Sequence, residues 1–330
     1  MTGWRGQERA IAELLAALGG ERLHHAWLLG GPAGVGKAGI ALDFAKRLLG
    51  AAADPLAGQG ELAVAKDDRH GNLIDAGTHP DLIRIARLNR DAKKGEAPTL
   101  ARNISVDQIR SLSRFLHLAP SMADRRVVLI DAAEDMERGA ANALLKNLEE
   151  PPSGTVFLLI SHAPGRLLPT IRSRCRYVHF QPLDDAQMNN VLASIVPDLP
   201  ATDRQALIRG AEGAPGRALA MRELDIAGLE STLERIAQDG DPTHRERIAL
   251  ARQLSPKAAQ ARYEAFLDFV PHYIARRLRT GQTGREAAQA DVWAEAVSLG
   301  QGAITLSLEP AAIIFSLCGA VAKLAERNSL

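Results

Sequence analysis

The stretch AWLLGGPAGVGKA, residues 26–38, decides the fold of the N-terminal part of this 330-residue chain. Residues 26–30 are a short apolar run, which predicts a strand. Residues 31–38 fit the phosphate-loop pattern G-x-x-x-x-G-K-[ST] at every fixed position except the last. Apolar residues then recur at helical spacing over residues 37–49. Strand, glycine-rich loop and helix in this order are the context that a phosphate loop requires.

The composition of this loop suits phosphate binding better than hydrolysis. Gly31, Gly34 and Gly36 let backbone N–H groups converge on phosphate oxygens beside the positive end of a helix. Lys37 is predicted to neutralise the charge of the β- and γ-phosphates. Ala38 stands where the pattern requires the hydroxyl that ligates Mg²⁺. Because phosphoryl transfer depends on the placement of metal and charge, this loss argues against hydrolysis at the loop.

A second element of such a site is the apolar strand VVLID, residues 127–131. The strand continues into Ala132, where a hydrolase of this type usually has a glutamate that polarises water. Two interpretations of Asp131 are open: the relic of a metal ligand, or a strand-end aspartate that caps the next turn. Glu134 is expected on another face, so it is not predicted to replace the missing acid.

Strands and helices alternate up to about residue 182. This alternation favours an α/β domain with a largely parallel sheet covered by helices on both faces. Residues 105–108 read as a capping box that opens a helix. Residues 50–78 show no clear pattern, and residues 86–103 have loop character. Strands are predicted at 26–30, 80–85, 126–130, 155–160 and 176–180, and helices at 7–19, 37–49, 105–118 and 137–149, with a short one before Ser173.

The strand pattern ends after Pro182, and the rest of the chain reads as helical. Residues 184–222 predict short helices broken by prolines and glycines, and residues 226–328 are mostly helical. We therefore expect an α/β domain over 1–182, a small helical domain over 183–222 and a larger helical domain over 223–330.

The composition is that of a soluble globular protein, with 46% hydrophobic and 24% charged residues. The net charge of +1 neither demands nor excludes nucleic acid as a partner. Cys175 and Cys318 are far apart in the sequence, which fits a reducing compartment better than a disulfide scaffold. The N-terminus lacks the apolar core of a signal peptide, and no window predicts a membrane span. We expect a cytoplasmic protein.

Arg174 is the residue that we single out for function. It follows the strand predicted at 155–160 and a connecting helix, so it is expected at the edge of the α/β domain. An arginine placed there can reach the nucleotide of a neighbouring subunit and stabilise transition-state charge on its γ-phosphate. From its spacing alone, a surface arginine or a salt-bridge residue is the commoner interpretation.

Three segments favour the interpretation that Arg174 acts on the nucleotide of a neighbouring subunit. They are GTHPD at 77–81, NALLKNLEEPP at 142–152 and SRC at 173–175. Together with the order of phosphate loop, acidic strand and SRC, they resemble the AAA+ clamp-loader family from about residue 5 to 182. The helical remainder resembles that family in layout only. The resemblance implies an AAA+ domain with a relic phosphate loop (1–182), a small helical lid (183–222) and a helical collar that holds a hetero-oligomer together (223–330).

The resemblance also implies that ATP hydrolysis and the arginine finger of Arg174 belong to different subunits. Arg174 matches the arginine finger that points into the ATP site of the adjacent motor subunit. Gly216 matches the position of the motor subunits' second sensing arginine, and Arg217 follows one residue later. We therefore expect a non-motor subunit without intrinsic ATPase, within a DNA polymerase holoenzyme that is itself a nucleotidyltransferase. Its expected partners are the motor subunits and the delta subunit, with the sliding clamp and primed DNA reached through the assembly.

Two alternatives stay open at this point. One is an active motor of the same family, which requires Lys37 and Asp131 to suffice without Ser/Thr and Glu. The other is a phosphate-loop kinase, which the helical C-terminal half argues against. No cofactor is expected to be required, although weak ATP or ADP binding by Gly31, Gly34, Gly36, Lys37 and Asp131 is compatible with the sequence. Members of the family often carry a cysteine-ligated zinc module, but residues 50–76 contain no cysteine, so no zinc is expected.

Overall fold

The computed structural model describes residues 4–20, 23–50, 62, 64, 68–90, 99–280, 286–305 and 308–325. The chain divides into two compact units, Met1–Pro197 with Glu212–Gly216, and Asp198–Ala211 with Arg217–Leu330. The domain boundaries expected after residues 182 and 222 stay a prediction.

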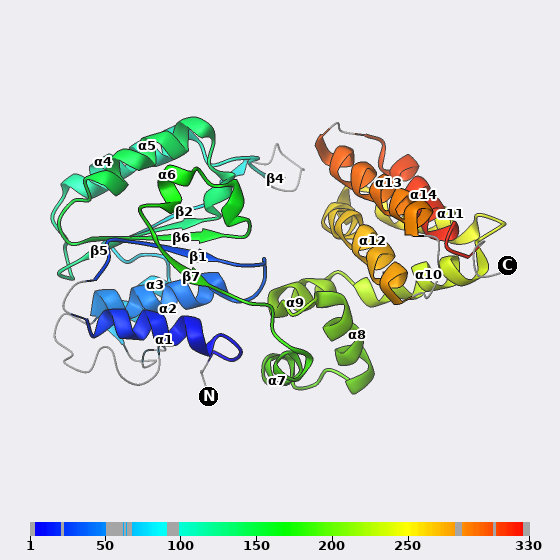
Figure 1. Cartoon of the computed structure of the whole chain (residues 1–330), viewed down its shortest axis with the longest axis horizontal. Helices are drawn as coiled ribbons and strands as arrows, with labels where there is room; N and C mark the ends of the chain where they lie inside the picture. Colours follow the sequence, from blue (N-terminus) through cyan, green and yellow to red (C-terminus); the bar gives the residue numbers. More distant parts are fainter. Residues whose placement is uncertain are drawn as a thin grey trace. The chain divides into compact units, whose positions relative to one another are not determined.

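The first unit is built on a five-stranded parallel sheet (Figure 1). The strand order is β2-β5-β6-β1-β7. The apolar runs form these strands because both faces of the sheet are buried, as expected for a parallel sheet. The bounds are β1 Ala26–Gly30, β2 Leu82–Ile85, β5 Arg126–Asp131, β6 Thr155–Ser161 and β7 Arg176–His179.

Helices cover both faces of this sheet, so the predicted α/β fold class is confirmed (Figure 1). Trp27 and Leu29 of β1 pack with α1 and α2, whereas Leu28 packs with α4 and α5 on the opposite face. This alternation follows from the two-residue period of a strand. One layer contains α1 Glu8–Leu18, α2 Lys37–Gly50 and α3 Arg69–Asp75; the other contains α4 Val106–His117, α5 Arg138–Glu149 and α6 Pro169–Arg172.

Local sequence signals account for several element ends. The capping box is confirmed, since Ser105 Oγ accepts from Gln108 N–H and Gln108 Oε1 accepts from Ser105 N–H. The sequence did not reveal α3, which begins after Asp68, whose carboxylate accepts from Gly71 N–H. The stretch expected as loop contains two paired segments, β3 Asn89–Arg90 and β4 Thr99–Leu100.

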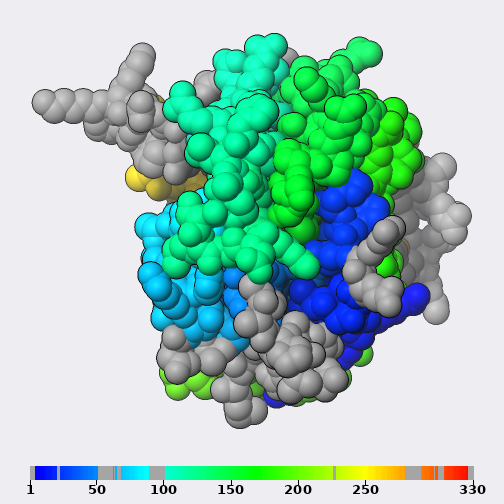
Figure 2. Space-filling model, turned by 90° about the vertical axis from the view of Figure 1, so that its left-hand side faces the viewer, coloured from blue at the N-terminus to red at the C-terminus, as the bar shows by residue number. Residues whose placement is uncertain are grey.

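The motif at 77–81 ties two segments of the first unit together. The buried Asp81 carboxylate accepts hydrogen bonds from the backbone N–H groups of Ser121, Met122 and Ala123. Figure 2 shows the teal segment that includes these residues beside the light-blue segment that includes Asp81. Burial alone would raise the pKa of Asp81, but the three N–H groups lower it. Asp81 therefore fixes the loop that leads into β5.

The described residues after β7 are helical, as predicted. In the second unit α14 contacts α10, α11, α12 and α13. Its apolar side chains are buried around most of its circumference, which is typical of a central helix. After β7 the chain forms α7 Asp185–Ile195, α8 Ala201–Ala211, α9 Pro215–Glu223, α10 Ile226–Asp239, α11 Arg245–Leu254, α12 Gln260–Thr280, α13 Glu286–Thr305 and α14 Pro310–Ala322.

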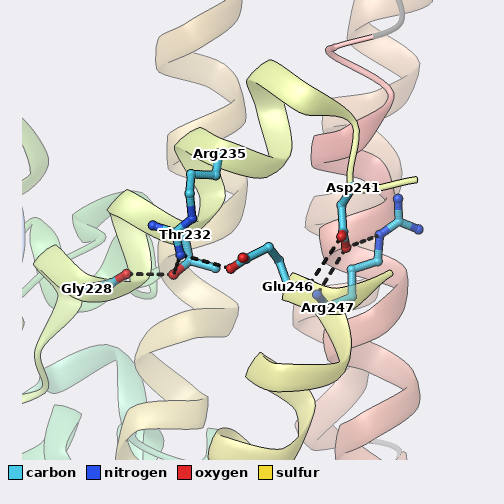
Figure 3. A network of polar contacts seen from close by, with 6 residues as sticks. All are labelled: Gly228, Thr232, Arg235, Asp241, Glu246 and Arg247. Carbon is cyan, nitrogen blue, oxygen red and sulfur yellow. Dashed lines mark hydrogen bonds and ion pairs between the residues drawn. The ribbon is translucent and has the colours of Figure 1, made fainter. Parts of the chain in front are cut away.

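Polar contacts hold the connection between α10 and α11 (Figure 3). The buried Asp241 carboxylate accepts from the backbone N–H groups of Glu246 and Arg247, so it caps the start of α11. The Arg247 guanidinium lies 3.4 Å from the same carboxylate. Arg235 adds a bond from α10 to Glu246 at 2.9 Å. Among the described residues, no helix combines the length and apolar character needed to cross a membrane.

Candidate functional site

The phosphate loop lies between the carboxyl end of β1 and the start of α2. Gly31 is required there, because a Cβ at this position would lie 2.2 Å from the carbonyl oxygen of Phe180. Its φ of +155° and those of Gly34 (+80°) and Gly36 (+99°) are conformations that glycine adopts readily. The turn thus has the backbone that the sequence pattern predicts.

Lys37 is engaged by its own loop. Only 2% of the residue is exposed, and its Nζ donates to the carbonyl oxygens of Gly31, at 2.6 Å, and Pro32. Burial lowers the pKa of Lys37 to about 8, against the negative charges of Glu134 and Asp131, which raise it. The ammonium therefore helps to close the turn.

Trp4 covers the beginning of α2, a contact that the sequence did not reveal. A Cβ at Gly39 would lie 2.2 Å from the Trp4 ring, and one at Gly36 would lie 3.3 Å from it. The indole Nε1 donates to Asp43 at 2.7 Å. The N-terminal segment is thereby fixed against the helix that follows the loop.

The acidic strand carries an ion pair in place of a free carboxylate. Asp131, at the end of β5, lies 3.0 Å from the Arg84 guanidinium of β2. Arg87 makes a second such pair with Asp135, also at 3.0 Å. The positive charge beside Asp131 is thus supplied by an arginine of the same chain. Neither Ala38 nor Ala132 adds a polar side chain to this edge of the sheet.

Glu134 lies nearer to this site than its spacing suggested. Its Oε1 accepts from the backbone N–H of His162, just after β6, at 2.7 Å. Its charge acts on Lys37 together with that of Asp131. The expectation that Glu134 is on another face is therefore wrong. Burial and the charge of Lys37 lower the pKa of His162, so this imidazole is neutral near pH 7.

Gly216 packs directly on the loop. Its backbone N–H donates to the Gly34 carbonyl oxygen at 2.8 Å, and a Cβ at Gly216 would lie 3.1 Å from that oxygen. Close backbone packing thus explains the glycine at the position that the resemblance assigns to a second sensing arginine. Arg217, the next residue, instead pairs with Asp268 at 3.4 Å.

Arg174 follows the short helix α6 in the first unit. Its Nη2 lies 2.7 Å from Glu149 Oε1, and its Nη1 donates to the Thr170 carbonyl oxygen at 2.9 Å. The side chain is 34% exposed. Lys37 and Asp131 thus share one end of the sheet with the glycines of the loop, whereas Arg174 is bonded to α5 and α6. The motif at 142–152 includes Glu149, but the sequence gave no indication that Glu149 contacts Arg174.

The cysteines offer no reactive thiol. Burial raises the pKa of Cys175 and of Cys318 to about 12, so both are protonated near neutral pH. Within the described ranges, no three His, Cys, Asp or Glu side chains are grouped as a metal site would require. Most of residues 50–76 lies outside the described residues, so the absence of zinc there stays a prediction.

Comparisons with known proteins agree with the motifs. The family described as DNA polymerase III, delta subunit, matches residues 6–184. The delta' subunit of DNA polymerase III from Pseudomonas aeruginosa is 41% identical over 204 residues, which are 61% of this chain and 57% of that protein. The tau/gamma subunit from Haemophilus influenzae is 37% identical over 216 residues, or 64% of this chain and 28% of that protein.

The alignments span little more than half of the Pseudomonas relative and less of the other. A gamma subunit-related protein of DNA polymerase III from Thermotoga maritima aligns in structure over 97% of this chain and 99% of its own, with a TM-score of 0.47 and 18% identity. Since the family match covers more than half of the 330 residues, the chain belongs to the DNA polymerase III delta subunit family.

Proposed function

We propose that this chain is a non-motor subunit of the DNA polymerase III clamp loader, and that Arg174 acts in trans on the ATP of a neighbouring motor subunit. The loader would place the sliding clamp onto primed DNA at the expense of ATP. The partners we propose are the motor subunits and the delta subunit, with clamp and DNA reached through the assembly, in the cytoplasm. Membership of the family supports this role.

The observation that carries the proposal is a contrast within the first unit. The charged groups of the phosphate loop are bonded inside the chain, Lys37 to loop carbonyls and Asp131 to Arg84. Arg174 is also bonded within the chain, to Glu149 and Thr170, but its side chain is one-third exposed, whereas Lys37 is buried. Hydrolysis at the loop requires Lys37 and Asp131 to be available to a nucleotide, whereas an arginine finger requires only that Arg174 can reach a neighbouring site. This contrast supports an arginine donor over a motor.

The second unit would supply the contacts that hold the hetero-oligomer together. It exposes large apolar side chains on three helices, Ile248 on α11, Trp293 on α13 and Phe315 on α14. Exposed apolar groups of this size are favourable in interfaces between subunits. We propose them as contact residues for the collar role that the layout of the helices suggested.

The test compares Arg174→Ala with Arg172→Ala in a reconstituted loader. Arg172 is an exposed arginine two residues away, so its removal controls for charge. We expect Arg174→Ala to leave assembly intact. We expect it to lower DNA-dependent ATP hydrolysis at the ATP site of the neighbouring motor subunit by about 10³-fold or more. Unchanged hydrolysis would remove Arg174 from this role.

The purified chain by itself separates the two family roles. We expect no sustained ATP hydrolysis with or without primed DNA, because Ala38 offers no hydroxyl, Asp131 is paired with Arg84, and Glu134 accepts from the His162 backbone N–H. DNA-stimulated turnover that Lys37→Ala abolishes would instead identify a motor.

A further inference from the structure

The contact between Arg174 and Glu149 has a consequence for the proposed finger, on whose function this inference rests. We propose that Glu149 is a positioning residue: it holds the Arg174 guanidinium against the first unit in the free subunit and gives it up to the phosphate of a neighbour's nucleotide. The contact is a close one, with Nη2 of Arg174 2.7 Å from Oε1 of Glu149.

Both ends of the contact are fixed by packed elements. Glu149 is the last residue of α5, between the buried Leu148 and the Pro151-Pro152 pair that follows the helix. Arg174 lies two residues after the end of α6, which packs against α5. The bond from Arg174 Nη1 to the Thr170 carbonyl holds the guanidinium over α6. The pair is therefore a product of the fold rather than of two freely moving side chains.

Charge balance makes the contact incompatible with the finger's task. A guanidinium paired with a carboxylate has its charge neutralised, whereas stabilising a transferring phosphoryl group requires that charge. A phosphate carries at least as much negative charge as the carboxylate and accepts the same planar donors. Arg174 can therefore exchange Glu149 for a phosphate without ever being left unpaired.

The pair is weak enough for this exchange. The side chain of Arg174 is 34% exposed and that of Glu149 is 49% exposed. Ion pairs at such positions shift an equilibrium by about two- to five-fold, because water screens them. Glu149 also stands at the negative end of α5, where a carboxylate is disfavoured unless a cation compensates it. Glu149 thus has an electrostatic reason to keep Arg174 while no phosphate competes.

Arginine reactivity in the isolated full-length chain tests the contact directly. Phenylglyoxal modification of Arg174, followed by peptide mass spectrometry, is compared in wild type, Glu149→Gln and Glu150→Gln. Glu150 is the matched control, because among the described residues it has no ion pair. We expect Glu149→Gln to speed the modification of Arg174 about two- to five-fold and Glu150→Gln to leave it unchanged. Equal rates in all three proteins would overturn the inference.

The same variants in the reconstituted loader test the consequence. We expect Glu149→Gln to raise DNA-dependent ATP hydrolysis up to about five-fold over wild type, with Glu150→Gln at the wild-type rate. A rate at or below wild type for Glu149→Gln would overturn the exchange, since Glu149 would then support the finger or be irrelevant to it. Failure of the proposed function is distinct, because it would show as unchanged hydrolysis in Arg174→Ala.

Discussion

The Arg84 guanidinium lies 3.0 Å from the Asp131 carboxylate, at the carboxyl end of the same parallel sheet as the phosphate loop. The register of the sheet creates this pair. Arg84 of β2 is opposite Leu129 of β5, and Asp131 follows two residues later on the same face. An arginine of the same chain thereby supplies positive charge beside Asp131.

The first prediction concerns nucleotide binding. Because Ala38 offers no hydroxyl and Arg84 neutralises Asp131, we propose that any ATP bound by the loop is held weakly and without help from Mg²⁺. Equilibrium binding of labelled ATP is measured in Mg²⁺ and in EDTA. We expect the two dissociation constants to agree within about two-fold, a difference of only about 0.4 kcal/mol. Binding that is ten-fold tighter in Mg²⁺ would contradict this.

Lys37 is the subject of the second prediction, which concerns stability. Lys37→Ala leaves the carbonyl oxygens of the buried Gly31 and the exposed Pro32 without this donor. We expect the free energy of unfolding to fall by about 1–3 kcal/mol, measured by urea denaturation. The control is Lys146→Ala, an exposed lysine on α5, which should change it by less than about 0.5 kcal/mol. Equal values for the two variants would show that Lys37 does not stabilise the loop.

Much of the first unit could be predicted from the sequence, for a physical reason. A parallel sheet buried on both faces needs continuous apolar runs, so residues 127–130 and 155–160 could be recognised as strands from the sequence. The capping box at Ser105 fixed the start of α4 because its hydrogen bonds are local. Such signals lie within a few residues of one another and do not depend on the rest of the fold.

The partners within the site could not be predicted in the same way. Arg84 and Asp131 are 47 residues apart, and they meet only because β2 is the neighbour of β5 in the sheet. Glu149 and Arg174 meet because α5 packs on α6. Strand order and helix packing are set by the whole core, so no local pattern reports them. The motifs therefore indicated which residues matter but not what each contacts.

A third prediction concerns pH and the buried His79. The backbone N–H of Asp81 donates to His79 Nδ1 at 3.1 Å, which requires that nitrogen to be unprotonated. His79 Nε2 in turn lies 2.9 Å from His70 Nδ1. Burial, and then His70, lower the pKa of His79 below its ordinary value of 6.5, against the charge of Asp81. The unfolded chain therefore binds this proton more tightly, and stability is lost as the pH falls below about 6.5.

The His79→Asn variant isolates this effect from the other histidines. An asparagine oxygen can still accept from Asp81 N–H but does not titrate. We expect the free energy of unfolding of the variant to fall less than that of wild type between pH 7 and pH 5.5, the difference approaching about 1.4 kcal/mol per pH unit. His117→Asn, on the exposed end of α4, should retain the wild-type slope. A slope for His79→Asn as steep as that of wild type would mean that His79 does not titrate in this window.

The fourth prediction concerns Arg126, which is 5% exposed at the start of β5. Its guanidinium donates to the carbonyl oxygens of Phe115, Leu116 and Leu118, so it closes the C-terminal end of α4 from the neighbouring strand. Arg126→Ala would leave these carbonyls without a donor and remove the cation from the face of the Phe115 ring. We expect a loss of about 2–4 kcal/mol in the free energy of unfolding.

One further variant separates the geometry of Arg126 from its charge, and a second serves as a control. Arg126→Lys keeps the charge but loses the planar fork that reaches several carbonyls at once. We therefore expect its loss in the free energy of unfolding to be smaller than that of Arg126→Ala. Arg125→Ala removes the exposed neighbour and should change stability by less than about 0.5 kcal/mol. Because α4 carries most of these bonds, hydrogen exchange in Arg126→Ala should quicken first at the amides near His117. If exchange instead quickens uniformly over the first unit, the guanidinium stabilises the unit as a whole and not the end of this helix.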